Sequence, residues 1–309
     1  LRFLVFPARS LITLRKIKKR MNNIKIELHA DDLGISKQAN ESIFHAIDEG
    51  VVRGVSVIVG NENGETGILE ALKRNVRVSL HLNLTDGQAL TKKKLKNYIT
   101  DSNNNFSKNF LGFFFCKYKK NFANVKEDVE KEIRQQIKEF KRISNLKEIS
   151  VDGHNHIHSI PWVSDILINL ANEEKINWIR LPYEKFYISN IKIFFCFWFY
   201  VNFLKFLILR IFSYSLKKKL IKNDIKFASN FLGILETGHM KFSSIKNGLK
   251  KIIRNDLKNE KKHIEILIHP HYGTQTTFDY EKNRQDELIL ARNQKLKNLI
   301  YAYESSNSN

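Results

Sequence analysis

Glu-Ile-Ser-Val-Asp-Gly-His-Asn-His-Ile-His, residues 148–158, is a short apolar run that ends in one aspartate and three histidines. If the segment stays extended, alternation places four side chains on one face: Asp152, His154, His156 and His158. Such groups desolvate and repel one another when they crowd into an ordinary core. A divalent metal removes that conflict, because imidazole and carboxylate are its natural ligands. The pattern predicts a metal site at a strand end; the alternative is a histidine-rich surface loop.

Short apolar runs alternate with helical patterns on both sides of this segment. Strands are predicted at 24–29, 54–59, 76–82, 148–151, 178–181, 226–228 and 265–268. Helices are predicted at 37–49, 67–74, 125–143, 163–173 and 284–303. This alternation implies parallel strands joined by right-handed crossovers.

The predicted strands end in polar side chains. These are His29, Asp31 and Asp32 after the first strand, His81 in the third, Asp152 in the fourth, Arg180 in the fifth, and His269 and His271 after the last. In a closed barrel of parallel strands all carboxyl ends open on one rim, where active sites form. An open doubly wound sheet gathers only the residues near its switch point. We therefore expect an α/β fold, a distorted (β/α) TIM-like barrel of about seven parallel strands, with the active site at its carboxyl-end rim.

The composition is that of a globular protein with a sizeable core: 309 residues, 42% of them hydrophobic and 27% charged. The formal charge of +20 is spread along the chain. No recognition helix, zinc finger or aromatic RNA-binding motif accompanies it, so no nucleic-acid partner is expected. Two cysteines, Cys116 and Cys196, provide no disulfide framework. That favours a reducing, cytoplasmic location, with peripheral contact at the inner face of the membrane as a further option.

A single domain is expected over residues 21–303. Residues 1–20 are apolar, then basic, and have no evident cleavage site, so they are interpreted as a leader outside the core, with Met21 as an alternative start. Residues 86–124 are polar, Asn-rich and aromatic without clear period, which indicates an excursion over the site. Residues 304–309 are expected to form a disordered tail.

An apolar helical insertion is expected at residues 187–220, centred on 191–212. Its uncharged stretch, 193–204, is shorter than the ~20 residues that a membrane-spanning helix needs. One interpretation is a helical hairpin that is buried or forms a homodimer. Another is an interfacial helix that lies on a membrane, with basic residues at the headgroups, and the third is a true transmembrane span.

Five motifs follow one another along the chain. They are Ala30-Asp-Asp-Leu-Gly-Ile-Ser36 with Asn40, Ser79-Leu-His-Leu-Asn-Leu-Thr-Asp-Gly87, Asp152-Gly-His-Asn-His-Ile-His158, Arg180-Leu-Pro182 and Glu265-Ile-Leu-Ile-His-Pro270. In type and order they resemble the motifs of the YdjC-like carbohydrate deacetylases. The resemblance covers roughly residues 24–273. That group includes chitooligosaccharide deacetylases and an enzyme type that acts on hopanoid glycolipids.

The resemblance implies a distorted barrel and a divalent metal, magnesium or zinc, with Asp32, His81 and His154 as its ligands. It makes Asp31 the catalytic base and His269 a general acid or oxyanion donor. Four further residues are expected to orient the ligands or to contact sugar hydroxyls: Asp152, His156, His158 and Arg180. The chain departs from the family pattern at three positions: His29, Leu33 and His271.

The implied reaction is removal of the N-acetyl group from an amino sugar by metal-activated water. The aromatic, basic-flanked segment at 191–212 motivates the hypothesis that this sugar is lipid-linked. Two alternatives stay open. One is another metal-dependent hydrolase of phosphoesterase type on a similar barrel. The other is a non-catalytic, membrane-associated sugar-binding protein.

Overall fold

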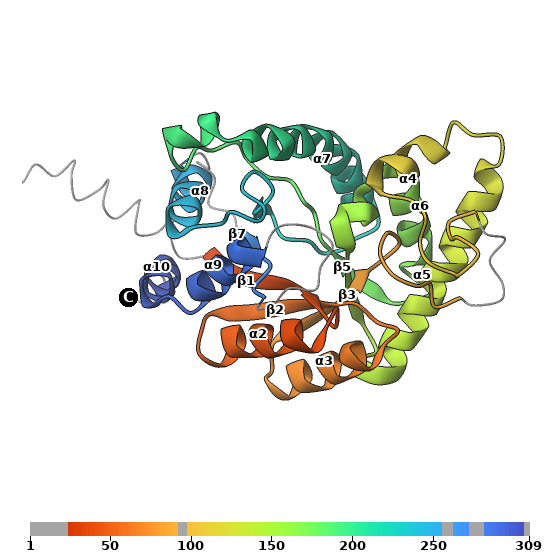
Figure 1. The fold of residues 1–309 in the computed structure, drawn as a ribbon, viewed down its shortest axis with the longest axis horizontal. Helices are drawn as coiled ribbons and strands as arrows, with labels where there is room; N and C mark the ends of the chain where they lie inside the picture. The colour runs from red at the N-terminus through yellow and green to blue at the C-terminus, as the bar shows by residue number, and fades with distance from the viewer. Residues whose placement is uncertain (1–23, 92–97, 255–261, 272–280, 306–309) are drawn as a thin grey trace, which may run out of the picture.

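The computed structural model describes residues 24–91, 98–254, 262–271 and 281–305, which share one seven-stranded sheet (Figure 1). Its strands are β1 (Ile24–Leu33), β2 (Val52–Val57), β3 (Arg77–Leu82), β4 (Ile149–Gly153), β5 (Ile176–Ile179), β6 (Asn230–Leu232) and β7 (Lys262–Ile268). They lie in the order β5-β4-β3-β2-β1-β7-β6, and all neighbours are parallel. The predicted TIM-like arrangement of about seven parallel strands is confirmed. The leader predicted at 1–20 lies outside the described residues.

The sheet curls until its two edge strands, β5 and β6, approach each other. Isolated parallel bridges join Trp178 to Lys226 and Glu184 to Phe231, so the edges meet at two points without a continuous ladder. The fold is therefore a curled half-barrel. The strand predicted at 226–228 is wrong, because Lys226 contributes one bridge whereas β6, further along, pairs with β7 over its whole length.

Helices cover the outside of the barrel (Figure 1). They are α2 (Lys37–Asp48), α3 (Glu62–Lys73), α4 (Phe110–Cys116), α5 (Phe122–Ser144), α6 (Pro161–Leu170), α7 (Phe197–Lys222), α8 (Phe242–Arg254), α9 (Glu281–Ala291) and α10 (Gln294–Ser305), with 3-10 turns η1 (His154–Ser159) and η2 (Ile191–Phe195). Helix α3 begins earlier than predicted because Asn61 caps it, accepting a hydrogen bond from the Gly64 amide.

The predictions for the two insertions, at 187–220 and 86–124, need correction. The segment at 187–220 is a 3-10 turn followed by the single long helix α7, so the hairpin interpretation is wrong. The excursion at 86–124 is not irregular throughout, because it contains α4 and the first turn of α5.

The end of the chain also differs from expectation. The closing helix predicted at 284–303 is two helices, α9 and α10. Glu304, assigned to the tail, lies in α10, and its carboxylate accepts hydrogen bonds from the Ile26 amide and the Arg53 guanidinium. These bonds attach α10 to the amino end of β1.

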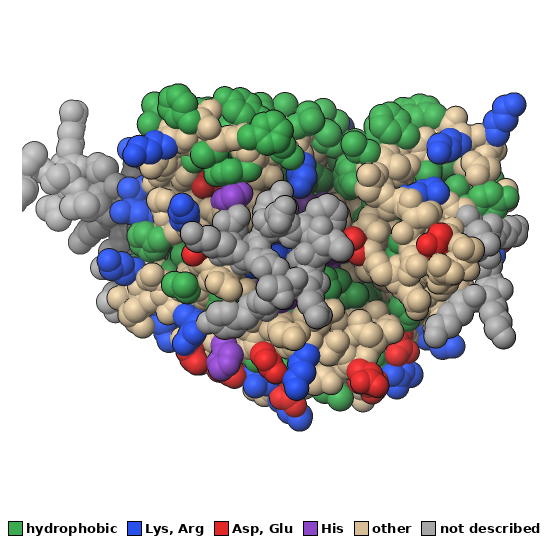
Figure 2. Space-filling model, in the orientation of Figure 1, with side chains coloured by type: hydrophobic (Ala, Val, Ile, Leu, Met, Phe, Trp, Pro, Cys, Tyr) green, Lys and Arg blue, Asp and Glu red, His purple; other side chains and the backbone are tan. Residues whose placement is uncertain are grey.

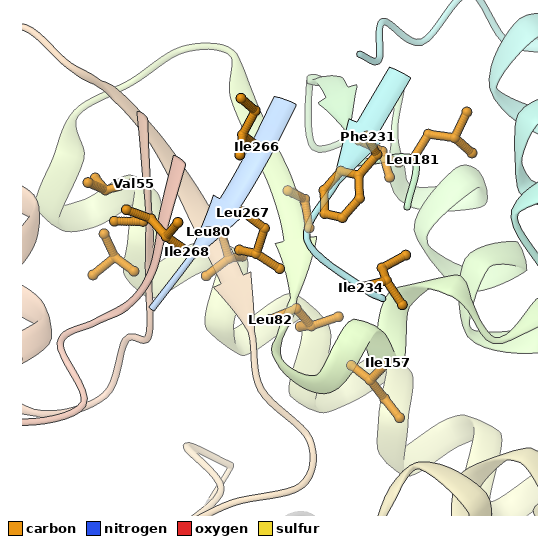
Figure 3. Packing of buried hydrophobic residues seen from close by; sticks show 14 of the residues in the cluster. Val55, Leu80, Leu82, Ile157, Leu181, Phe231, Ile234, Ile266, Leu267 and Ile268 are labelled. Carbon is orange, nitrogen blue, oxygen red and sulfur yellow. The ribbon is translucent and has the colours of Figure 1, made fainter. Parts of the chain in front are cut away.

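Both faces of the strands are buried, but their chemistry differs. In β1, Ile26 and Leu28 belong to the apolar layer, together with residues such as Val55, Leu80 and Ile266 that Figure 3 shows. The alternating residues form the other face, which points into the barrel. They are Glu27, His29 and Asp31 from β1, Ser56 from β2, His81 from β3, Asp152 from β4 and Glu265 from β7. Parallel strands buried on both faces are usually apolar throughout, so this polar interior is the unusual feature of the sheet.

Candidate active site

Asp31 and Asp32 both reach the rim because β1 is irregular at its carboxyl end. Its register with β2 shifts between Ala30 and Leu33, and Asp32 has a left-handed backbone with φ of 69°. In a regular strand, consecutive side chains would point to opposite faces. The bulge turns both carboxylates inward, and aspartate tolerates this conformation better than most residues.

The expectation that the four polar residues of the 152–158 segment share one face is wrong. Strand β4 ends at Gly153, and the chain enters η1, where Asn155 and His156 have φ of 54° and 56°. The tight turn replaces the two-residue alternation of a strand, so only Asp152 still follows the strand pattern.

The turn separates the three histidines of η1. His154 points to the rim, where it meets Asp32. His156 stands edge-on to the Phe231 ring, with 5.9 Å between centroids, and His158 Nε2 lies 3.1 Å from the Arg180 carbonyl. His156 and His158 therefore support the loop and the wall of the barrel. Burial lowers the pKa of His158 to about 4, so its imidazole is neutral at pH 7.

Three donor atoms converge at the rim from three separate elements. Asp32 Oδ1 lies 2.9 Å from His154 Nδ1 and 3.5 Å from His81 Nε2, and the two imidazole nitrogens are 3.3 Å apart. The imidazole planes are nearly perpendicular, at 81°. Ligands about 2.0–2.2 Å from a common zinc ion are separated by about 3.0–3.5 Å, so this spacing fits one cation.

Each histidine of this cluster has a carboxylate on its outer nitrogen. His81 Nδ1 lies 2.6 Å from Asp152 Oδ1, and His154 Nε2 lies 3.2 Å from Asp86 Oδ2. A carboxylate in this position holds the proton on the outer nitrogen and leaves the inner lone pair for a metal. The two carboxylates therefore favour, in each imidazole, the tautomer that metal binding requires.

The electrostatics at the cluster favour positive charge. Burial alone would lower the pKa of His81, but Asp31 and Asp152 outweigh it and raise that pKa to about 10. Burial is likewise outweighed at His154, where Asp32 raises the pKa to about 9. Burial would raise the pKa of Asp32, yet His154 and other cations hold it well below its ordinary value. One proton on each imidazole balances the negative charge of the surrounding carboxylates. A divalent cation would supply the same charge.

A metal also accounts for one poorly satisfied atom. Among the residues that the structure describes, Asp32 Oδ1 is buried without a well-formed hydrogen bond, although His154 Nδ1 is 2.9 Å away. A buried carboxylate oxygen without a partner is costly. The ligand atoms of Asp32, His81 and His154 lie within 4.8 Å of one another, so one cation between them would satisfy all three.

Asp31 has a different environment. Its two oxygens accept hydrogen bonds of 2.7 and 2.8 Å from the Arg180 guanidinium, and Oδ2 lies 3.8 Å from His81 Nε2. Burial would raise the pKa of Asp31, but Arg180 and His81 outweigh it and lower that pKa. Asp31 is therefore an ionised carboxylate next to the three-donor cluster.

Arg180 is the central cation of the barrel interior. Besides Asp31 it contacts Asp152 Oδ2 at 3.0 Å and Glu265 Oε1 at 2.5 Å, and its side chain is 1% exposed. A second set of donors, His29, Asp31 and Asp152, could also hold a metal by spacing. The Arg180 guanidinium already contacts both carboxylates of this set, and the positive charge beside them makes the set a poorer cation site than the first.

His269 follows the carboxyl end of β7, on the same rim. Its amide donates a 2.6 Å hydrogen bond to Glu287 Oε2, and its Nδ1 lies 3.8 Å from the same oxygen. Glu287 is fully buried in α9 and therefore positions the residue. The unusual His29 contacts Glu27 and Ser56 deeper in the barrel, and His271 Nε2 lies 3.4 Å from Ser36 Oγ.

Sequence reasoning missed several residues of the site. Asp86 and Glu265 stand inside motifs that were recognised, so the signal was present but their partners were not apparent. Arg284, which lies 3.3 Å from Asp32 Oδ2, and Glu287 come from a helix with no recognised motif. Nothing in the local sequence around them marks them as site residues.

Asp152 and Asp86, the carboxylates on the outer nitrogens of the two histidines, should differ in how much they contribute to metal binding. We expect Asp152→Asn to weaken zinc binding about 100-fold and Asp86→Asn about 10-fold, because Asp152 is buried at 2.6 Å whereas the Asp86 side chain is 46% exposed. Competition with a fluorescent chelator measures the affinities. The exposed Asp101→Asn is the matched control. Unchanged affinity in both test variants would show that these carboxylates do not orient ligands.

Fold and site together define a class: a TIM-like half-barrel with a cluster of two histidines and one aspartate at its carboxyl-end rim. The profile of the YdjC-like protein family matches residues 25–302. The chain therefore belongs to the YdjC-like family, as its motifs indicated.

Curated relatives are similar over part of the chain. A carbohydrate deacetylase of Xenopus laevis is 27% identical over 167 residues, 52% of each chain. One of Oceanobacillus iheyensis is 30% identical over 155 residues, 50% of this chain and 63% of the relative. One of Homo sapiens is 21% identical over 264 residues, 81% of this chain and 75% of the relative. The first two alignments thus span between half and two thirds of the relatives' length.

A solved structure is similar over nearly the whole chain. It is a protein of Enterococcus faecalis V583 to which cellobiose-phosphate cleavage is provisionally attributed. The TM-score is 0.68 at 18% identity, over 91% of this chain and 95% of that one. At this identity the similarity supports the fold.

Proposed function

We propose that this protein is a metal-dependent carbohydrate deacetylase that hydrolyses the N-acetyl amide of an amino sugar. The observation that carries the proposal is the convergence of Asp32, His81 and His154, with Asp152 and Asp86 on the outer nitrogens of the two histidines. The family and the names of its curated relatives support a carbohydrate as substrate and deacetylation as the reaction.

Asp32, His81 and His154 would hold the metal. Bound there, a divalent cation would acidify water and polarise the acetyl carbonyl. Two imidazoles and one carboxylate suit zinc better than magnesium, which prefers oxygen ligands and retains its waters. We therefore propose zinc. Three protein ligands leave coordination positions open, as catalytic zinc sites require.

Asp31 would act as the base and His269 as the acid. The Arg180 pair keeps Asp31 ionised and fixes its orientation, so its oxygens can accept a proton from the attacking water. His269, positioned by Glu287, would donate a proton to the departing amine nitrogen. That step is needed because an amine leaves poorly as an anion. His156, His158 and Arg180 would maintain the walls around this centre.

We propose a lipid-linked amino sugar as substrate and a peripheral position at the cytoplasmic face of a membrane as the place of work. The apolar and basic segment around α7 supports both. A homodimer through the same segment is the competing arrangement. A hydrolase of phosphoesterase type is less well supported, since the Arg180 guanidinium already contacts both carboxylates of the second donor set.

The direct test is acetate release from a panel of N-acetylhexosamine oligosaccharides and glycolipids. We expect acetate and free amine in equal amounts, a loss of at least about 100-fold after chelation, and recovery with zinc, because the metal supplies several kcal/mol of transition-state stabilisation. Undiminished acetate release by metal-free protein would contradict the proposal. Phosphate release from sugar phosphates would indicate a phosphoesterase, and binding without turnover a sugar-binding protein.

A further inference from the structure

Helix α7 has two apolar faces of which the protein covers one. Its inner face is buried at Phe199, Asn202, Phe206, Leu209, Phe212, Ser213, Leu216 and Leu220. Its outer face exposes Phe197, Tyr200, Val201, Leu204, Leu207, Ile211, Tyr214 and Ile221. Both sets recur every three to four residues, so each lies along one side of the helix. A surface helix of a globular protein normally carries polar residues on its outer side.

Neighbouring elements extend this outer face. In η2, Ile191 and Phe195 are 73% and 89% exposed. In α4, Leu111 and Phe115 are exposed, and α4 packs on α7 through stacking of Phe110 on Phe212. Figure 2 shows hydrophobic side chains gathered along the upper edge of the view, over α7 and α4. We call these exposed residues of η2, α7 and α4 the α4–α7 surface. Contiguous apolar surfaces of this kind usually mark a binding site.

The charged side chains within η2 and α7 are all of one sign. Residues 185–223 contain eight lysines and arginines and no aspartate or glutamate. Lys192, Lys217 and Lys218 are exposed, and Lys218 lies over the Tyr214 ring at 4.5 Å. Aromatic side chains bordered by lysines match the boundary between lipid tails and anionic headgroups.

The inner face ties α7 to the domain. Arg210 donates a hydrogen bond to the Glu184 carbonyl, and Asn202 donates one to the Thr237 carbonyl. By length and composition, the 26-residue helix Phe197–Lys222 could cross a membrane. Crossing would break these bonds and expose the buried apolar face of the domain. The attachments instead hold α7 along the protein surface, with only its outer face free.

We propose that the α4–α7 surface docks onto an anionic phospholipid bilayer, with α7 parallel to the membrane plane. The surface borders the active-site rim, because α7 contacts η1, the turn that begins with His154, and Trp198 stacks on His239 in the loop after β6. Docking would present the rim to a headgroup-linked sugar, a consequence that rests on the proposed function, whereas docking itself does not.

A second copy of the chain is a poorer occupant. In a twofold dimer the same patch faces itself, so the lysines of one protomer would lie near those of the other. Like charges across an interface are repulsive. Anionic headgroups instead neutralise the lysines while the acyl region accepts the aromatic rings.

The test is flotation of the full chain with vesicles of phosphatidylcholine, with or without phosphatidylglycerol. We expect preferential binding to the anionic vesicles that weakens as salt is raised. Leu204→Glu/Ile211→Glu should reduce binding about 30-fold or more, because both side chains leave the acyl region and two negative charges are added. The control, Leu69→Glu/Ile289→Glu, adds the same charge at exposed apolar positions of α3 and α9 and should bind normally.

Three outcomes would overturn the proposal: wild-type protein that does not float with anionic vesicles, equal loss of binding in both double variants, or a dimer in sedimentation that Leu204→Glu/Ile211→Glu alone dissociates. Hydrolysis of soluble diacetylchitobiose distinguishes a failure of membrane docking from a failure of the proposed function. The test variant should retain that activity while losing vesicle binding. Absence of acetate release by wild type from every oligosaccharide and glycolipid of the panel would refute the enzyme assignment and leave docking intact.

Discussion

Asp32→Asn is expected to lower deacetylation by about 10³-fold or more and to reduce bound zinc from one equivalent to a small fraction. Asp32 provides the one carboxylate among the three converging donors, and the neutral amide is a poor ligand. Losing the metal removes several kcal/mol of transition-state stabilisation, and each 1.4 kcal/mol is about tenfold in rate. Asparagine also tolerates the left-handed backbone of this position, φ 69°, so the bulge in β1 should persist.

The measurement pairs acetate release with metal analysis of the purified variant. Asp48→Asn, on the surface of α2 beside Arg74, is the matched control and should keep both activity and zinc. Thermal unfolding checks that Asp32→Asn still folds. An Asp32→Asn protein with wild-type activity and no metal would rule out the mechanism.

Arg180→Met is expected to destabilise the fold by about 3–5 kcal/mol. The guanidinium is 1% exposed and lies between three carboxylates: Asp31, Asp152 and Glu265. Removing one partner of a buried ion pair leaves uncompensated charge in a poorly solvated interior. Domains are stable by about 5–15 kcal/mol, so the loss is a large fraction of the total.

The destabilisation should depend on pH with a definite sign. In the wild type, Arg180 holds the pKa values of Asp31 and Asp152 below the ordinary 3.8, against the effect of burial. Their contribution to stability is therefore complete above about pH 4 and is lost as the pH falls through the lowered values. Without Arg180, burial dominates and raises both pKa values, so these carboxyls are tolerated when protonated. The difference in free energy of unfolding between wild type and Arg180→Met should therefore narrow from pH 7 toward pH 4.

Urea unfolding at several pH values measures this difference in free energy of unfolding. Arg134→Met is the control: Arg134 pairs with Glu130 and Glu173 on the surface of α5, and its loss should cost less than about 1 kcal/mol. Arg180→Lys keeps one positive charge and should lie between wild type and Arg180→Met. A loss for Arg180→Met that is independent of pH would mean that packing, not charge, is what Arg180 contributes.

Sequence reasoning predicted much of the barrel and the set of residues that meet at the rim. The apolar runs marked six of the seven strands to within a few residues, because buried parallel strands are short and punctuated by turns. Asp32, His81 and His154 follow or end three such strands, and the structure brings their donor atoms together. Parallel topology makes that outcome general, since all carboxyl ends lie on one edge.

The same reasoning failed where local conformation departs from a regular period. Alternation placed His156 and His158 on the side of Asp152, but η1 turns them toward Phe231 and the Arg180 carbonyl. Strict alternation would also send Asp31 and Asp32 to opposite faces of β1, whereas the bulge at Asp32 brings both to the rim. Periodicity describes regular elements and does not anticipate a bulge or a 3-10 turn.

By itself, the sequence determined the order of strands and helices, the chemistry available at each strand end, and an apolar helical insertion. Those properties depend on neighbours along the chain. The tertiary structure alone decided that Arg180, just after β5, pairs with Asp31 from β1, that Asp86 contacts His154, and that the domain covers one apolar face of α7 and leaves the other outside. These are pairings between residues tens of positions apart, and their energies depend on distance and burial, which exist only once the sheet has curled.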